Sequence, residues 1–196
     1  MAARNKSATL EEVNQKPRLS LQSEVIAEDT STIRSLDWDR SRFDIEFGLR
    51  NGTTYNSFLI KGAKNALIDT SHIKFSETWF IELKKLIEPT KINYLIVSHT
   101  EPDHSGLISK LLDLNPKIEI IGSKVAIKFL EDQVHRTFLS RPVKNGEKIH
   151  LGINKSSGID HCIEFLSAPN LHWPDTIFSF DHGSCVLYTC DAFGLH

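Results

Sequence analysis

Residues 95–106 read Leu95-Ile96-Val97-Ser98-His99-Thr100-Glu101-Pro102-Asp103-His104-Ser105-Gly106, an apolar run that ends in four possible metal ligands. The apolar run predicts a central strand covered on both faces. The ligands His99, Glu101, Asp103 and His104 are therefore expected in a loop at the end of that strand. In an extended loop alternate side chains face one way and neighbours face apart, so this loop can serve two metal ions. The compact spacing favours a metal site over the simpler alternative, a solvated turn before a helix.

The segments around this loop predict a layered α/β sheet protein with helices on the outside. Helices are expected where apolar residues recur at helical spacing, at Phe75–Ile87, Gly106–Leu114 and Ser123–Val134. Strands are expected before and between them, at Ala66–Thr70, Asn93–Val97 and Ile118–Ile121. Shorter strands should follow at Lys148–Leu151, Cys162–Leu166, Thr176–Phe180 and Cys185–Thr189.

The beginning of the chain is harder to place. Residues 1–31 are mostly polar and lack periodicity, so we predict a flexible leader there and one partial domain over residues 32–196. Asn51-Gly52 is a strong hairpin signal, which predicts that Arg42–Leu49 pairs with Thr53–Ile60. A second hairpin is expected around Lys61–Asn65.

Composition narrows the class of protein. The 196 residues are 40% hydrophobic, which suits one globular domain, and the net charge of −2 gives no argument for nucleic acid or an anionic membrane. No apolar run reaches transmembrane length, and no signal peptide is visible. The three cysteines have neither CxxC spacing nor the density of a disulfide scaffold, so they read as reduced thiols. We expect a soluble cytoplasmic protein.

Two more candidate ligands follow later strands. His172 lies after the strand-like run Cys162–Leu166, and Asp191 lies after the run Cys185–Tyr188. Taken alone, each of these residues is more simply explained as a packed or surface residue. Together with the loop that carries His99, however, three strand-end loops each present a possible metal ligand. Imidazoles mixed with carboxylates suit iron or manganese, often as a bridged pair, better than zinc, and Asp191 is the natural bridge. Cys190 adjoins Asp191 but could face the opposite side of its strand, and it is given no redox role.

Three segments resemble the signatures of the flavodiiron proteins: residues 99–106, Asn170–Asp175 and Asp191–Gly194. The earlier runs Ser35–Arg40, Phe43–Gly48 and Gly52–Ser57 are similar to the multidomain members of cyanobacteria and other oxygenic phototrophs. This resemblance implies a metallo-β-lactamase-like αββα sandwich, incomplete at the C-terminus. Most hydrolases of that fold have histidine where this chain has Glu101 and bind zinc, so the resemblance implies a diiron oxidoreductase instead.

The resemblance also implies a ligand set. His99, Glu101 and His172 would bind one iron, Asp103 and His104 the other, and Asp191 would bridge them. A further histidine lies downstream in the family, and the terminal His196 is not assigned that role. FMN belongs to a flavodoxin-like domain, and a second flavin to a reductase module that takes electrons from NAD(P)H or a related donor. Neither fits in 196 residues, so we expect an N-terminal fragment that is inactive alone.

The implied activity of the complete protein is reduction of dioxygen to water with electrons delivered through FMN, as an electron sink for photosynthesis. Nitric oxide is the alternative substrate within the family. The reduced flavin domain of a second subunit, in a homo- or hetero-oligomer, would be the partner. Two other hypotheses stay open: a dizinc hydrolase of the same fold, and a non-catalytic subunit that pairs with an active one.

Overall fold

A seven-stranded sheet forms one half of the molecule. The computed structural model describes residues 18–43 and 47–194. The strands lie in the order β1-β2-β5-β6-β7-β8-β9. Their bounds are β1 Leu19–Ala27, β2 Thr30–Asp37, β5 Thr53–Lys61, β6 Asn65–Ile68, β7 Ile92–Ile96, β8 Glu119–Ser123 and β9 Leu139–Val143. The strands from β1 to β6 pair antiparallel, and those from β6 to β9 pair parallel.

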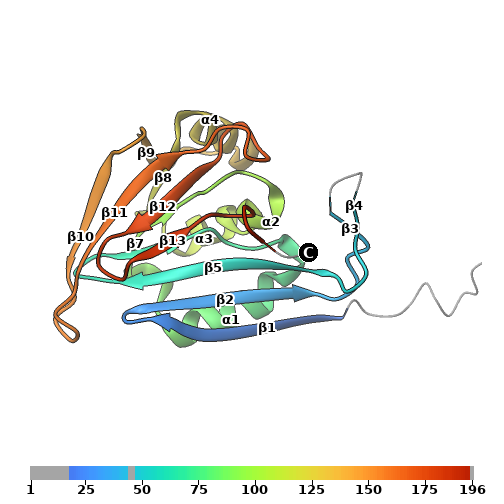
Figure 1. The fold of residues 1–196 in the computed structure, drawn as a ribbon, viewed down its shortest axis with the longest axis horizontal. Coiled ribbons are helices and arrows are strands. Elements are labelled where there is room, and N and C mark those ends of the chain that lie inside the picture. The colour runs from blue at the N-terminus through green and yellow to red at the C-terminus, as the bar shows by residue number, and fades with distance from the viewer. Residues whose placement is uncertain (1–17, 44–46, 195–196) are drawn as a thin grey trace, which may run out of the picture.

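A four-stranded antiparallel sheet forms the other half, in the order β10-β11-β12-β13. Its bounds are β10 Lys148–Ile153, β11 Asp160–Ser167, β12 Ile177–Asp181 and β13 Val186–Tyr188. A small separate ribbon pairs β3 Arg42–Phe43 with β4 Phe47–Gly48. Figure 1 shows the two main sheets facing each other across the molecule.

Helices cover the outer face of the larger sheet (Figure 1). They are α1 Ser76–Leu86, α2 Pro102–Ser105, α3 Ile108–Leu114 and α4 Lys124–Val134, with short 3-10 turns at η2 Ile73–Phe75 and η3 Pro89–Lys91. The hydroxyl of Ser123 accepts a hydrogen bond from the Ala126 amide and so caps the start of α4, as its sequence predicts. None of the helices in the described ranges is long and apolar enough to cross a membrane.

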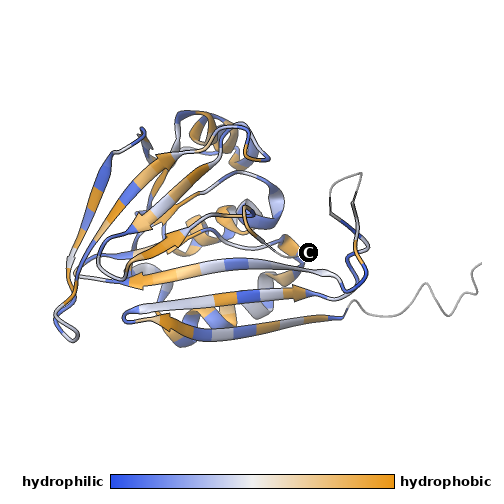
Figure 2. Ribbon diagram, viewed as in Figure 1, coloured by the Kyte–Doolittle hydropathy of each residue, from blue (hydrophilic) through white to orange (hydrophobic). Residues whose placement is uncertain are grey.

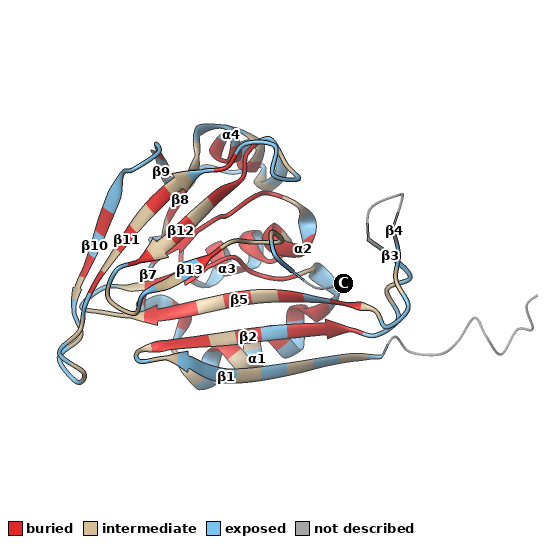
Figure 3. Ribbon diagram, viewed as in Figure 1, coloured by how far each residue is buried: buried red, intermediate tan, exposed pale blue. Residues whose placement is uncertain are grey.

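Two hydrophobic cores separate these layers. Leu67 and Leu95 face the helices and belong to the core that includes Trp79 of α1, which is fully buried. Ile68 and Ile96 face the other way, into the core shared with the four-stranded sheet. Figure 2 shows the hydrophobic residues along the strands, and Figure 3 shows that they are buried. The central strands are therefore covered on both faces, as their apolar sequences predict.

The architecture is that of a metallo-β-lactamase-like α/β domain. In the described part of the chain it consists of helices, a mixed sheet and an antiparallel sheet. The predicted helices and the strands from Ala66 onwards are confirmed with shifts of a few residues. Strand β9 was not predicted. It carries Pro142 and lies at the edge of the sheet, where the missing amide hydrogen of a proline is tolerated.

The predicted hairpin at Asn51-Gly52 is wrong. The segment Arg42–Leu49 is expected to pair with β5, but β3 and β4 within it pair with each other, and β5 pairs with β2 and β6. Gly52 has a φ of +76°, and a Cβ there would lie 2.1 Å from the carbonyl oxygen of Asp37. Glycine is therefore needed because the chain passes close to the end of β2.

The predicted leader over residues 1–31 is also wrong where it can be seen. Residues 1–17 lie outside the described residues, but β1 and its turn to β2 fall within residues 19–31. Every second residue over the first half of β1 is exposed, so this edge strand presents a polar face to solvent (Figure 3). The polar residues on this face explain why the segment was predicted to be a flexible leader.

Candidate metal centre

The loop after β7 carries four of the predicted ligands. Because β6 and β7 are parallel, their carboxyl ends meet at one edge of the sheet, where loops can converge on a site. Glu101 precedes Pro102 and is held in an extended conformation, while Pro102 starts the short helix α2. The expectation that the loop stays extended through Asp103 is therefore wrong. Asp103 and His104 instead lie on a helical turn, which directs them differently from Glu101.

The remaining two ligands come from the four-stranded sheet. His172 lies between β11 and β12, and Asp191 follows β13. His172 has a φ of +79°, a backbone conformation that residues other than glycine rarely adopt. Such strain often marks a functional position. The loop is joined to the β7 loop by Asp175, which accepts hydrogen bonds from the amide and the hydroxyl of Thr100.

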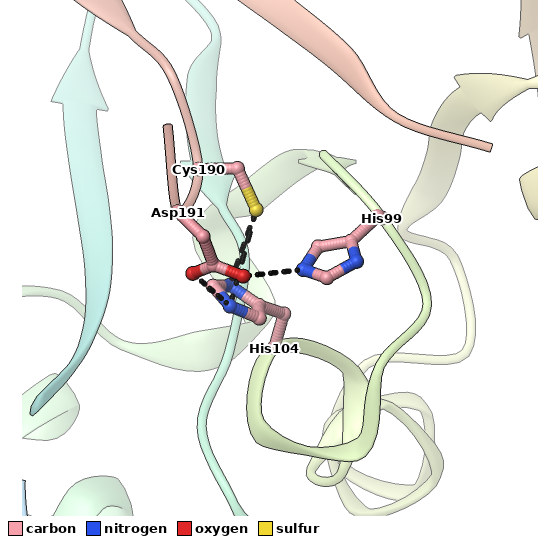
Figure 4. Close-up of side chains that lie close together, drawn as sticks. All are labelled: His99, His104, Cys190 and Asp191. Carbon is pink, nitrogen blue, oxygen red and sulfur yellow. Dashed lines mark hydrogen bonds and ion pairs between the residues drawn. The ribbon is translucent and has the colours of Figure 1, made fainter. Parts of the chain in front are cut away.

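All six predicted ligands lie in one cluster. Donor atoms within 4.8 Å of one another form three overlapping groups: His99, His104, Cys190 and Asp191; His99, Glu101 and Asp103; and Glu101, His172 and Asp191. Asp191 lies between two imidazoles, with one oxygen 2.9 Å from Nε2 of His104 and the other 3.2 Å from Nε2 of His99 (Figure 4). Nε2 of His172 lies 2.9 Å from a carboxylate oxygen of Glu101.

The cluster has buried polar atoms without hydrogen-bond partners. They are both ring nitrogens of His99, one carboxylate oxygen of Asp103 and one of Asp191; the last lies 3.2 Å from Nε2 of His99 as an ion pair without a hydrogen bond. Buried polar atoms are nearly always paired, and each unpaired one costs about 1–3 kcal/mol. Bound cations would satisfy the two carboxylate oxygens and one ring nitrogen of His99, because each of these atoms can then donate a lone pair. The residues present therefore fit a metal centre.

The same groups shift each other's protonation. Burial lowers the pKa of His99, but Asp191 and Cys190 outweigh burial and raise it to about 10. Burial opposes protonation of His104 as well, yet its neighbours Cys190, Asp191 and Asp69 hold its pKa well above the ordinary value. Burial raises the pKa of Asp191, but the two imidazoles more than offset this, so it lies below its ordinary value. Without metal, the centre is thus held together as ion pairs.

Glu101 differs from Asp191. Burial and the nearby carboxylate of Asp103 raise its pKa, and His172 offsets this only in part. A carboxylate in that environment lacks enough positive charge around it. A cation placed between Glu101, Asp103 and His99 would supply that charge.

Asp69 is a site residue that the sequence analysis missed. One of its oxygens accepts a hydrogen bond of 2.7 Å from the amide of Ser98, and the other lies 3.5 Å from Nδ1 of His104. It therefore orients the imidazole whose Nε2 faces Asp191, as the outer partners of metal ligands do. Its position in the sequence could have identified it, because Asp69 directly follows the buried strand β6 and His99 likewise follows β7.

Cys190 is the second residue that was misjudged. Strand alternation would let it face away from Asp191, but its sulfur lies 3.7 Å from Nδ1 and 3.9 Å from Nε2 of His104 (Figure 4). The physical reason is local. Strand β13 ends at Tyr188, and Cys190 has a φ of +53°, so the alternation of a strand no longer applies there.

The fold and this cluster of histidines and carboxylates define the chain as a metallo-β-lactamase-like metal-binding domain. A sequence profile described as the ODP family beta lactamase matches residues 53–195. The chain belongs to the flavodiiron family, of which this is the metal-binding domain.

Relatives and solved structures agree with that assignment. Curated relatives from Nostoc sp. and Synechocystis sp. are 63% and 55% identical to this chain over 179 residues, and the second is diflavin flavoprotein A 1. The match covers 91% of this chain but 30% of each relative, so the chain spans about a third of their length. The metal-soaked flavodiiron core of a Synechocystis protein is 31% identical with a TM-score of 0.82, over 92% of this chain and 44% of that one. The anaerobic nitric oxide reductase flavorubredoxin of Aliivibrio salmonicida is 33% identical over 87% of this chain and 34% of its own length.

Proposed function

We propose that this chain is the iron-binding part of a flavodiiron oxygen reductase, which reduces dioxygen to water with electrons delivered through FMN. The observation that carries the proposal is the convergence of six histidine and carboxylate side chains, with unpaired atoms on three of them. Within the family, Glu101 in place of a histidine favours iron over zinc. An oxidoreductase is therefore preferred to a hydrolase.

The proposed ligand division is the one that the family resemblance implies. His99, Glu101 and His172 would hold one iron, and Asp103 and His104 the other. Asp191 would bridge, because its two oxygens face His99 and His104 separately. A bridging carboxylate needs this arrangement, with one oxygen directed at each metal position.

An iron pair would supply two metal-centred electrons and open coordination positions for a small gas. The chain's own residues provide a fixed frame for it. Asp69 orients His104, and Asp175 ties the loop of Glu101 to the loop of His172. Trp173 packs its ring edge-on to His99, with centroids 5.6 Å apart, and so limits movement of that imidazole.

The complete protein would carry the flavin parts. We propose a flavodoxin-like domain with FMN and a flavin reductase module with a second flavin, fed by NAD(P)H or a related donor. Electrons would reach the iron pair from the reduced flavin domain of a second subunit in a homo- or hetero-oligomer. The protein would act in the cytoplasm as an electron sink for photosynthesis. The residue 1–196 chain would have little oxidase activity alone.

Iron analysis of the 196-residue chain tests the metal part. We expect two irons per chain after anaerobic loading, and loss of most of that iron in Glu101→Gln and in Asp191→Asn. Glu119→Gln is the matched control, because Glu119 lies on β8 and pairs with Arg141 at a different end of the sheet. Zinc retained in preference to iron, with esterase or thioesterase activity, would instead support the dizinc hydrolase.

Oxygen uptake by the complete protein with a reduced donor tests the reaction. Uptake should stop in the Glu101→Gln protein while reduction of its flavins continues. If uptake persists without iron, the diiron assignment is wrong. If iron binds but neither gas is consumed, the chain belongs to a non-catalytic subunit.

Nitric oxide is the second candidate substrate. The similarity to a flavorubredoxin named for nitric oxide reduction favours it, and the histidine and carboxylate donors suit either gas. Measuring consumption of both gases by one preparation, each at the same concentration, separates the two.

A further inference from the structure

Cys190 gives the centre a second set of four donors. We propose that His99, His104, Cys190 and Asp191 bind one Zn²⁺ ion, or a cation of similar softness, in place of the iron pair. The four donor atoms lie within 4.8 Å of one another. None of the six residues assigned to iron supplies sulfur, so this site has a different chemistry from the diiron centre.

The spacing of the donors fits a tetrahedral ion. Zinc bonds of about 2.0 Å to nitrogen or oxygen and about 2.3 Å to sulfur place neighbouring donors roughly 3.3–3.6 Å apart. The observed separations are 2.9 Å from Nε2 of His104 to Asp191, 3.2 Å from Nε2 of His99 to Asp191 and 3.9 Å from Nε2 of His104 to the sulfur of Cys190. Each of these three separations differs from the tetrahedral value by a few tenths of an ångström, and the other donor pairs lie within 4.8 Å.

A second observation points to a missing ion at this place. His99 is 1% exposed, yet neither of its ring nitrogens makes a hydrogen bond, and Nε2 meets the Asp191 oxygen only as an ion pair at 3.2 Å. The ring of His99 lies 4.5 Å from that of His104, between centroids. Donor atoms of His99 and Asp191 that make no hydrogen bond therefore lie beside the imidazole that the sulfur contacts.

The donor set selects for zinc over ferrous iron. One sulfur, two imidazoles and one carboxylate match the mixed sets that hold zinc in proteins, and sulfur favours softer cations. Sites of nitrogen, oxygen and sulfur generally bind Zn²⁺ more tightly than Fe²⁺. Replacing Cys190 would remove the softest donor and leave the proposed iron ligands in place.

Zinc and the iron pair would exclude each other, and this part of the inference rests on the proposed function. His99, His104 and Asp191 are shared by both sets, so a zinc ion that takes all three leaves no complete site for either iron. Cys190 would thus make iron loading sensitive to zinc. The sulfur decides which metal the centre accepts.

Cobalt(II) is the probe for the sulfur ligand, because it replaces zinc and its bonds to sulfur give a strong near-ultraviolet charge-transfer absorption. The wild-type 196-residue chain should show this absorption with visible bands of tetrahedral cobalt. Cys190→Ser and Cys190→Ala should lose it, while the matched control Cys185→Ser keeps it, since Cys185 is exposed and its sulfur contacts the carbonyl of His182. A wild-type spectrum without the sulfur absorption overturns the proposal and needs no variant that might misfold.

Zinc affinity, measured against a chromophoric chelator, is the second readout. Cys190→Ser should bind Zn²⁺ at least about tenfold more weakly than Cys185→Ser. Its iron content after anaerobic loading should stay at the wild-type value, and it should keep more of that iron when zinc is added. Equal zinc affinity in both variants would refute the role of Cys190. Failure of the diiron proposal looks different, because iron would then not bind even without zinc, whereas the cobalt spectrum would be unaffected.

Discussion

Asp175 accepts two hydrogen bonds from Thr100, one from its backbone amide and one from its hydroxyl, each 2.8 Å long. The two residues are 75 positions apart, and Asp175 is 1% exposed. This contact joins the loop that carries His99 and Glu101 to the loop that carries His172. This buried carboxylate therefore helps to fix the two halves of the candidate centre to each other, together with the contact of His172 with Glu101 and the hydrogen bond from the Ile177 amide to the Ser98 carbonyl.

Asp175→Ala should lower the free energy of unfolding by about 2 kcal/mol, because the amide of Thr100 would be buried without an acceptor. It should also weaken iron binding, since Glu101 and His172 lose their common anchor. Urea unfolding and iron analysis measure the two effects. Thr100→Ser is the control, as it keeps both donors and should change stability much less. If iron binding survives in Asp175→Ala, the loops are positioned by other contacts.

Asp69→Asn should reduce metal affinity about 10- to 100-fold while leaving the fold intact. The side-chain oxygen of the asparagine can still accept the hydrogen bond from the Ser98 amide. The group that faces His104 would then be a neutral NH₂ in place of a carboxylate oxygen. Cobalt titration measures the affinity, and circular dichroism checks the fold. Asp132→Asn, on the exposed face of α4, is the matched control and should bind like the wild type. An unchanged affinity in Asp69→Asn would remove Asp69 from the centre.

His161 forms a separate buried cluster that should matter for stability and not for metal. Its Nδ1 lies 2.7 Å from Asp181 and its Nε2 3.3 Å from Asp29, and the Ser157 hydroxyl also contacts Asp29. The imidazole thus connects the β1–β2 turn to the four-stranded sheet.

His161→Ala should lower the free energy of unfolding by about 3 kcal/mol, because the buried carboxylate of Asp181 and the largely buried carboxylate of Asp29 lose the group between them. His182→Ala is the control: its ion pair with Glu164 is exposed to solvent, so its loss should change stability much less. Urea unfolding compares the two. Iron content per folded chain should not change in either, and a selective loss of iron in His161→Ala would show that this cluster acts on the centre.

Gly52→Ala should destabilise the chain by several times more than Gly146→Ala. Both glycines have a φ of +76°, so both variants incur the strain of a left-handed backbone, about 1 kcal/mol. At Gly52 the new Cβ would also clash with the backbone of Asp37, whereas nothing lies within 4 Å at Gly146. Thermal or urea unfolding of the pair isolates the clash. Equal destabilisation would mean that the chain around Gly52 can move away freely.

Local sequence carried most of the information about the centre of the fold. The apolar run before His99 predicted β7, and polar residues at strand ends predicted where His172 and Asp191 would lie. The same reasoning, applied to the end of β6, would have found Asp69. These features were predictable because they depend on burial and alternation within a single strand.

Features set by distant parts of the chain were not predictable in this way. β5 pairs with β2 across an intervening ribbon, which the strong local signal at Asn51-Gly52 does not reveal. β1 looks polar because it is an edge strand. Cys190 faces the centre because the backbone turns at that residue, and strand alternation predicted the reverse.

The position of Asp191 also determines when the centre can form. It lies 87 residues after His104, with all of β8 to β13 between them. During synthesis the histidine loop leaves the ribosome long before its bridging carboxylate exists. The centre is complete only when the four-stranded sheet lies against the larger sheet and holds Asp191 beside the loop. Capture of metal by the finished centre therefore reports that both sheets have assembled.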